Sequence, residues 1–207
     1  MSVFVAEELS EVLNIENRIN IGLLNRIIID DVLLDDQSGQ EMLKVTRLSA
    51  KFDIMPFFKG KISISSVQLF GFNINLRKET PDSPPNFKFV LDAFASKDTV
   101  KKENSLDLRI NSILIRRGRM SYHVLSEEET PGKFNAKHIQ LQNIIANISL
   151  KALSKDSLNL GIKRLSLDEK ASGFSLKKMS LKLVANNKQT NIDNFTIELP
   201  ETSLKLD

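Results

Sequence analysis

The sequence contains no cysteine or tryptophan, only one tyrosine and only two histidines. Without cysteine the chain can form neither a disulfide framework nor a thiolate metal site. Nucleic-acid binding is disfavoured, because the aromatic content is 6%, the net charge is +3 and no concentrated basic stripe is present. No run of 18 apolar residues occurs, so the printed residues predict neither a transmembrane helix nor a signal peptide.

Catalytic signatures are also missing. The sequence has no GxGxxG, P-loop, GxSxG or HExxH motif, so we expect no enzyme activity and no cofactor. His123 and His138 lie far apart in sequence without a helix-spaced carboxylate, which favours solvated or loop positions over a metal site. EF-hand spacing is absent from the acidic residues near the first strands, which are predicted to lie in a solvated strand and turn: Asp30, Asp31, Asp35 and Asp36.

The sequence does contain an eight-residue pattern that occurs eight times. It reads apolar, any, apolar, two polar residues, apolar, any, apolar, and the last copy has threonine in the first position. In a regular strand the two halves of each copy would face opposite sides, because side chains alternate and the halves are offset by three residues. One extra residue, a β-bulge, returns both halves to one face. The copies occupy residues 27–34, 43–50, 62–69, 108–115, 139–146, 160–167, 174–181 and 190–197.

Two short helices are predicted beside these strands. Residues 1–14 have the spacing of an amphipathic helix, and residues 85–95 place Phe87, Val90 and Phe94 on one helical face. The remainder of 15–207 is interpreted as one repetitive antiparallel β domain with 85–95 inserted in it. Because the pattern continues to the last residues, we expect the chain to be a piece of a longer protein.

The predicted fold is therefore mostly β with two short helices. Long, bulged antiparallel strands form a curved sheet with one apolar face, either an open trough or a partly closed barrel or sandwich. The two helices carry too few apolar side chains to cover that face. The rest must be covered by the sheet itself, by a partner or by an apolar ligand.

Distinctive stretches accompany the pattern over about the first 95 residues. They include IIIDDVLL at 27–34, QEMLKV at 40–45, MPFFKGKISISSVQL at 55–69 and PNFKFVLD at 85–92. With these stretches the chain resembles the N-terminal region of TamB proteins, the inner-membrane component of the translocation and assembly module, in the AsmA-like superfamily.

The resemblance implies a periplasmic protein that is anchored in the inner membrane and forms a long β trough, or β-taco, toward the outer membrane. It implies phospholipid transport along a hydrophobic groove as part of outer-membrane biogenesis, with a role in protein secretion and assembly. It also implies membrane contact through an N-terminal helix and contact with an outer-membrane assembly protein of the Omp85 type through a C-terminal region. Both of these parts are expected outside this chain.

Two functional hypotheses follow. In the first, phospholipid acyl chains lie along the apolar face without a chemical step, and Arg116, Arg117 and Arg119 contact the head group or form a solvated edge. In the second, the chain is a scaffold whose strand edges bind outer-membrane or secreted protein strands by β-augmentation. The residues predicted to line the lipid groove are Ile62, Ile64, Val67, Leu69, Ile110, Ile113, Ile115, Leu141, Ile144, Ile162, Leu165 and Leu167.

Overall fold

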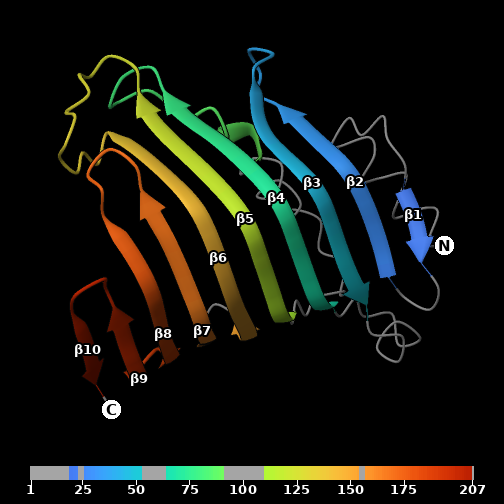
Figure 1. Cartoon of the computed structure of the whole chain (residues 1–207). Helices are drawn as coiled ribbons and strands as arrows, with labels where there is room; N and C mark the ends of the chain where they lie inside the picture. Colours follow the sequence, from blue (N-terminus) through green and yellow to red (C-terminus); the bar gives the residue numbers. More distant parts are fainter. Residues whose placement is uncertain (1–18, 23–25, 53–63, 91–109, 154–156, 207) are drawn as a thin grey trace.

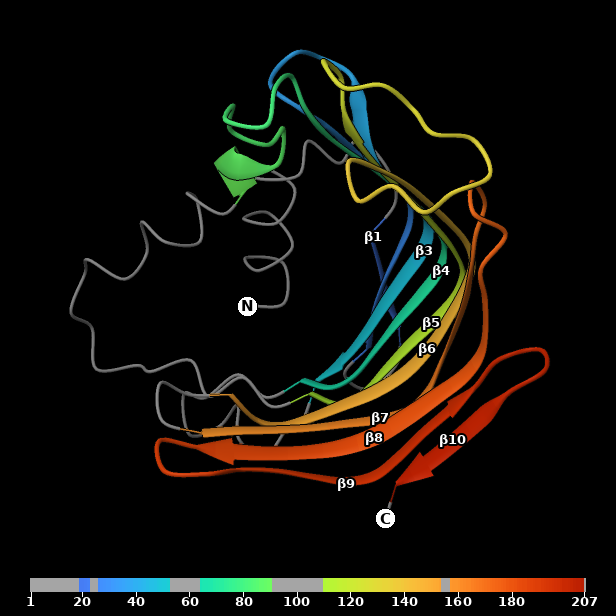
Figure 2. The same ribbon diagram turned by 90° about the vertical axis from the view of Figure 1, so that its left-hand side faces the viewer.

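The computed structural model contains one strongly curved β-sheet, shown in Figure 1 and, turned by 90°, in Figure 2. It describes residues 19–22, 26–52, 64–90, 110–153 and 157–206. Ten strands follow one another in chain order across the sheet, and among these residues no pairing joins the first strand to the last. The strands are β1 (Ile19–Gly22), β2 (Arg26–Asp35), β3 (Glu41–Phe52), β4 (Ile64–Lys78), β5 (Ile110–Val124), β6 (His138–Leu153), β7 (Ser157–Glu169), β8 (Ser175–Asn186), β9 (Thr190–Glu198) and β10 (Ser203–Leu206).

The predicted fold class is confirmed: the protein is mostly β, and its sheet is a curved open trough rather than a closed barrel. The predicted helix over 1–14 lies outside the described residues. Of the predicted helix over 85–95, residues 88–90 are helical and residues 91–95 lie outside the described part.

One pair of neighbouring strands differs from the expected antiparallel order. β4 and β5 run parallel, with a register that extends from Ile64 opposite Ile110 to Lys78 opposite Val124. Antiparallel neighbours can be joined by a short turn, whereas parallel neighbours need a crossover of a dozen or more residues. Residues 79–109 provide that length, so the insertion that interrupts the repeat is what allows β5 to run in the same direction as β4.

From β4 to β9 the predicted bulges are present at the polar pairs, whereas the pairs at 30–31 and 46–47 face each other without a register shift. In β7 the step from Ile162 to Leu165 spans Lys163 and Arg164, yet it faces the shorter step from Leu181 to Met179 in β8. One residue of β7 is therefore extra, and the apolar residues on both sides of the pair share a face. Between the same two strands, β8 also has an extra residue. Its three-residue step from Leu176 to Met179 faces the two-residue step from Leu167 to Leu165 in β7.

Left-handed backbone conformations mark several bulges. Asp31, Asn143 and Asn194 are each the second residue of a polar pair, and each has φ of 54°. Aspartate and asparagine tolerate this conformation better than other side chains, which explains their presence there. Arg117 in β5 (φ 55°) marks a further bulge outside the eight copies, and Gly71 in β4 also has a positive φ, of 64°.

The most buried apolar side chains lie beside these bulges. Val32 and Val45 are 2% exposed, and Phe72 and Ile144 pack with them in the same cluster. Space is tight here, because a Cβ on Gly118 would lie 2.3 Å from the Phe72 ring. Side chains converge on the inside of a bend, so we infer that the apolar face is the inner face of the curved sheet.

The left-handed residue in β9 provides a test of the bulge. Asn194→Gly should leave the stability unchanged, whereas Asn194→Val should lower the free energy of unfolding by about 1–2 kcal/mol, because a β-branched side chain is strained at positive φ. Urea unfolding monitored by circular dichroism measures the difference. Asn191→Val is the matched control, since Asn191 is exposed on the same strand and has no positive φ. An equal loss in both valine variants would contradict the bulge.

Candidate functional site

A continuous row of apolar side chains crosses the sheet from β2 to β10. Each member is the direct register partner of the next on the neighbouring strand, so all of them share one face. We call this row and its neighbour the apolar stripe. The first row is Ile29, Leu48, Leu69, Ile115, Ala146, Leu165, Met179, Ile197 and Leu204. The second row is Ile27, Ala50, Val67, Ile113, Ile148, Ile162 and Leu181.

The burial of the first row decreases toward the C-terminal strands. Ile29 and Ala146 are buried, most of the others are only partly buried, and Leu204 is 49% exposed. No large side chain of the described residues has an exposed fraction below 2%. In a closed sandwich, facing side chains from a second sheet would bury such a row. The stripe therefore keeps apolar surface that another molecule can cover.

Nearly all the residues predicted to line the groove are brought together on this face. Ile62 lies outside the described residues, and for Ile110 only the strand position, opposite Ile64, is described. The others lie in the stripe or in register with it: Ile64, Val67, Leu69, Ile113, Ile115, Leu141, Ile144, Ile162, Leu165 and Leu167.

The arginine cluster lies on the opposite face. Arg116 is the register partner of Phe70, and the Arg117 guanidinium lies 5.1 Å from the centre of the Phe70 ring. Arg119 is the partner of Asn73, which also alternates away from the stripe. These side chains therefore line the outer face of the sheet, separated by the backbone from an acyl chain on the stripe.

A depression of about 1010 Å³ occupies this outer face. Its charged walls are already partly neutralised, because Arg47 donates hydrogen bonds of 2.5 and 3.1 Å to both carboxylate oxygens of Asp30. The hydrogen bond from Arg47 is the main reason why the pKa of Asp30 is lowered. The residues around the depression are Asp30, Asp31, Thr46, Arg47, Gln68, Leu69, Phe70, Leu114 and Arg116.

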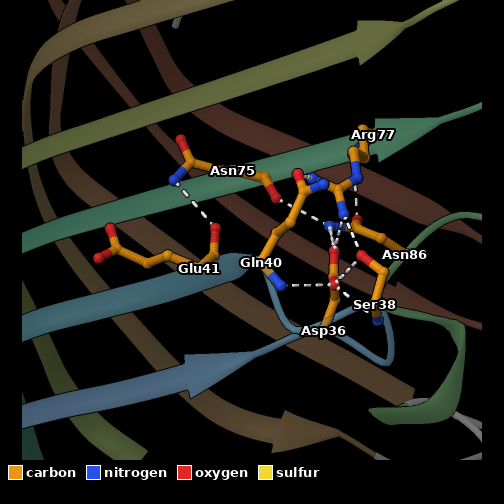
Figure 3. A network of polar contacts seen from close by, with 7 residues as sticks. All are labelled: Asp36, Ser38, Gln40, Glu41, Asn75, Arg77 and Asn86. Carbon is orange, nitrogen blue, oxygen red and sulfur yellow. Dashed lines mark hydrogen bonds and ion pairs between the residues drawn. The ribbon is translucent and has the colours of Figure 1, made fainter.

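A polar network at one end of the sheet holds the turn between β2 and β3 against β4 (Figure 3). Asp36 is 6% exposed, so the expectation that it is solvated is wrong. One carboxylate oxygen accepts hydrogen bonds from the backbone and hydroxyl of Ser38 and from the backbone of Gln40. The other accepts from Arg77 at 2.5 Å and from Asn86 at 3.2 Å. Asn86 lies just after β4, so the network anchors the start of the crossover.

The network explains the acidity of Asp36. Burial alone would raise the pKa of this carboxyl, but hydrogen bonds from Ser38, Gln40 and Asn86 outweigh burial and lower the pKa from 3.8 to about 2. The Glu169 carboxylate accepts hydrogen bonds from backbone N–H groups of the turn between β7 and β8 in the same way. Burial opposes the ionisation of Glu169, while hydrogen bonds from Ser172, Gln140 and Ala171 lower its pKa.

The two histidines, expected to be solvated or in a loop, also meet at this end of the sheet. They are register partners across β5 and β6, and His138 is only 7% exposed. Glu129, from the loop that joins these strands, lies beside them. The register of the hairpin formed by β5 and β6 brings these groups together. The only sign of this proximity in the sequence was the position of His123 and His138 on either side of a polar loop.

Comparison with known proteins returned no matching family model, curated protein or solved structure. Within the described residues, no helix is both long enough and apolar enough to cross a membrane.

Asp36 gives a prediction on stability against pH. A carboxyl with a pKa of about 2 in the folded state and 3.8 in the unfolded state adds its full stabilisation above about pH 4 and loses it as the pH falls toward 2. Asp36→Asn should therefore lower the free energy of unfolding by about 2 kcal/mol at pH 7. Urea unfolding at a series of pH values should show the difference from wild type shrinking below pH 4. Asp35→Asn, an exposed neighbour, is the control, and a pH-independent difference would contradict the assignment.

Proposed function

We propose that this chain is a non-enzymatic segment that binds the acyl chains of phospholipids along the apolar stripe. The observation that supports this best is the register itself, which places apolar side chains next to one another without interruption from β2 to β10 on one face. Partial exposure of most of these side chains leaves room for a ligand to bury them.

The dimensions of the stripe suit an acyl chain. Strands are about 4.8 Å apart, so a row from β2 to β10 is about 38 Å long. One leaflet of a bilayer has a hydrocarbon depth of only about 15 Å. A lipid tail can therefore lie along the row with both ends still on the stripe. Each methylene that leaves water contributes about 0.8 kcal/mol, and no catalytic group is needed.

The wider biological role is proposed from the sequence resemblance. On that basis the chain belongs to a TamB-like protein of the AsmA-like superfamily that moves phospholipid between the inner and outer membranes. The periplasmic location, the anchor in the inner membrane and the Omp85-type partner are parts of the same proposal. The open, one-sided sheet supports it, because a transport groove needs an apolar surface that is not sealed by the protein itself.

Lipid binding can be tested by native mass spectrometry. We expect protein purified without added lipid, then mixed with phosphatidylethanolamine in mild detergent, to retain adducts of phospholipid mass. Leu165→Arg should reduce the adduct fraction at least tenfold, because it places a charge in the middle of the first row. Gln142→Arg introduces the same side chain at an exposed position of β6 and should retain the adducts.

Far-ultraviolet circular dichroism must show that both arginine variants keep the β-sheet. Adducts that persist in folded Leu165→Arg protein, or that never form in the wild type, would refute the stripe as a lipid site.

The second candidate function, strand binding at the sheet edge, is supported by β10. This strand pairs only with β9 among the described residues, and its Leu204 and Leu206 are 49% and 55% exposed. An apolar, exposed edge of this kind is a template for an added strand.

Proline substitution separates this candidate from lipid binding. Neighbouring residues of an antiparallel strand direct their N–H groups to opposite sides, so one of the variants Leu204→Pro and Lys205→Pro must remove an outward donor. If strand addition occurs, fluorescence anisotropy should show one of them losing at least tenfold in affinity for a peptide of alternating valine and threonine. The Leu165→Arg variant should bind this peptide with wild-type affinity. If that variant loses peptide binding, the peptide binds to the apolar stripe and not to the sheet edge.

A further inference from the structure

The group formed by His123, His138 and Glu129 has the composition and geometry of a metal site. The Nδ1 atoms of the two histidines are 3.0 Å apart, with ring centres 5.3 Å apart and ring planes tilted by 52°. A carboxylate oxygen of Glu129 lies 3.8 Å from Nδ1 of His123. The three ligand atoms all lie within 4.8 Å of one another, close enough to share one metal ion.

The hydrogen bonds of His138 leave the required nitrogen available. Its Nε2 lies 2.9 Å from the backbone carbonyl oxygen of Glu127. A carbonyl oxygen can only accept, so this contact places a hydrogen on Nε2 and leaves Nδ1 as the ring nitrogen that faces His123. Histidines that bind metals characteristically donate their second ring N–H to such a carbonyl, which fixes the tautomer and the ring orientation.

The carbonyl that orients His138 is itself held in place. The Glu127 backbone N–H donates to the Val124 carbonyl at 3.0 Å, and the Glu127 carboxylate pairs with Lys137 at 2.6 Å. Val124 ends β5 and Lys137 directly precedes β6, so the two contacts tie Glu127 to both ends of the loop between these strands. His138 is therefore presented from a fixed position, while Glu129, whose side chain is 62% exposed, can adjust to a ligand.

The spacing of the ligand atoms fits a small divalent ion. Tetrahedral zinc with bonds of 2.0–2.2 Å places its ligand atoms about 3.4 Å apart. The distances of 3.0 Å and 3.8 Å lie on either side of this value, and the remaining pair of ligand atoms, from His138 and Glu129, lies within 4.8 Å. A cavity of about 260 Å³ borders both His138 and Glu129 and leaves space for a water molecule as a fourth ligand.

The charge around the group also suits a cation. Glu127 and Glu128 directly precede Glu129 in sequence, which makes this part of the loop acidic. Three cations are near: Lys137 pairs with Glu127, Lys170 lines the cavity, and Arg77 is the register partner of His123. The Arg77 guanidinium is directed to Asp36 and Ser38, and it is thus already compensated.

We propose that His123, His138 and Glu129 bind a first-row divalent metal ion, with Zn²⁺ as the best match to two imidazoles and one carboxylate. The ion joins β5, β6 and the loop between them at the end of the sheet where the turn between β7 and β8 also lies (Figure 1). Without metal, a hydrogen on Nδ1 of His123 can bond to Nδ1 of His138, and that hydrogen must move to Nε2 or leave when the ion binds.

Isothermal titration calorimetry with untagged protein, treated with EDTA and then desalted, tests the proposal. We expect one Zn²⁺ per chain, and a dissociation constant at least tenfold higher in both His123→Gln and Glu129→Gln. Glu128→Gln is the matched control, because it removes the same charge from an adjacent exposed residue and should leave the affinity unchanged. Titration with Co²⁺ provides a second readout, since a tetrahedral site with nitrogen and oxygen ligands gives d–d absorption bands in the visible range.

Either of two results would count against a bound metal ion. Absence of stoichiometric binding, or equal affinity in His123→Gln and wild type, would overturn the metal site. If His123→Gln fails to fold, Glu129→Gln still decides the question because the Glu129 side chain is largely exposed. None of these residues belongs to the apolar stripe, so loss of lipid binding in the earlier experiment leaves this result unaffected.

Discussion

The extra residue at the polar pairs from β4 to β9 is the constraint on which the rest of the sheet depends. Side chains in a strand alternate with a period of two, so an offset of three residues would divide the apolar side chains between the two faces. The bulges remove this conflict at Lys163 and Arg164 in β7 and at corresponding pairs in other strands. They also require left-handed backbone at particular points, which Asp31, Asn143 and Asn194 supply. One local feature thus accounts for the apolar face, the polar face and part of the curvature.

The sequence was sufficient to predict what depends on local pattern. Strand positions, bulges and the shared face of Ile162 and Leu165 all follow from residues that are close in sequence. Contacts between distant segments were not predictable in this way. Asp36 is buried because Arg77 at the end of β4 and Asn86 after it lie against the turn between β2 and β3, and the histidines meet only because of the β5 and β6 register. The repeat spacing also did not predict the bulge at Arg117 or the positive φ of Gly71, which lie outside the eight copies.

The same alternation separates the two chemistries of the molecule. Apolar side chains gather on the inner face, whereas charged residues such as Arg47 and Arg117 occupy the outer face, where Arg47 pairs with Asp30 and the Arg117 guanidinium lies over the Phe70 ring. A lipid on the stripe would therefore be recognised by its tails. Buried polar groups are concentrated at the ends of strands instead, where Asp36 and Glu169 satisfy turn N–H groups that have no partner in the sheet. This division allows the inner face to remain apolar without leaving backbone polar groups unsatisfied.

The parallel junction of β4 and β5 has a consequence for how the chain folds. On both sides of it, consecutive strands pair as antiparallel neighbours, so most contacts are local in sequence. Across the junction, paired residues such as Asn75 and Ser121 are separated by 46 positions. Closing so long a loop lowers the conformational entropy of the chain before any contact between β4 and β5 offsets that loss. A high contact order of this kind slows folding. Each meander can form its own hairpins early, and their docking along this single seam becomes the step that limits the folding rate.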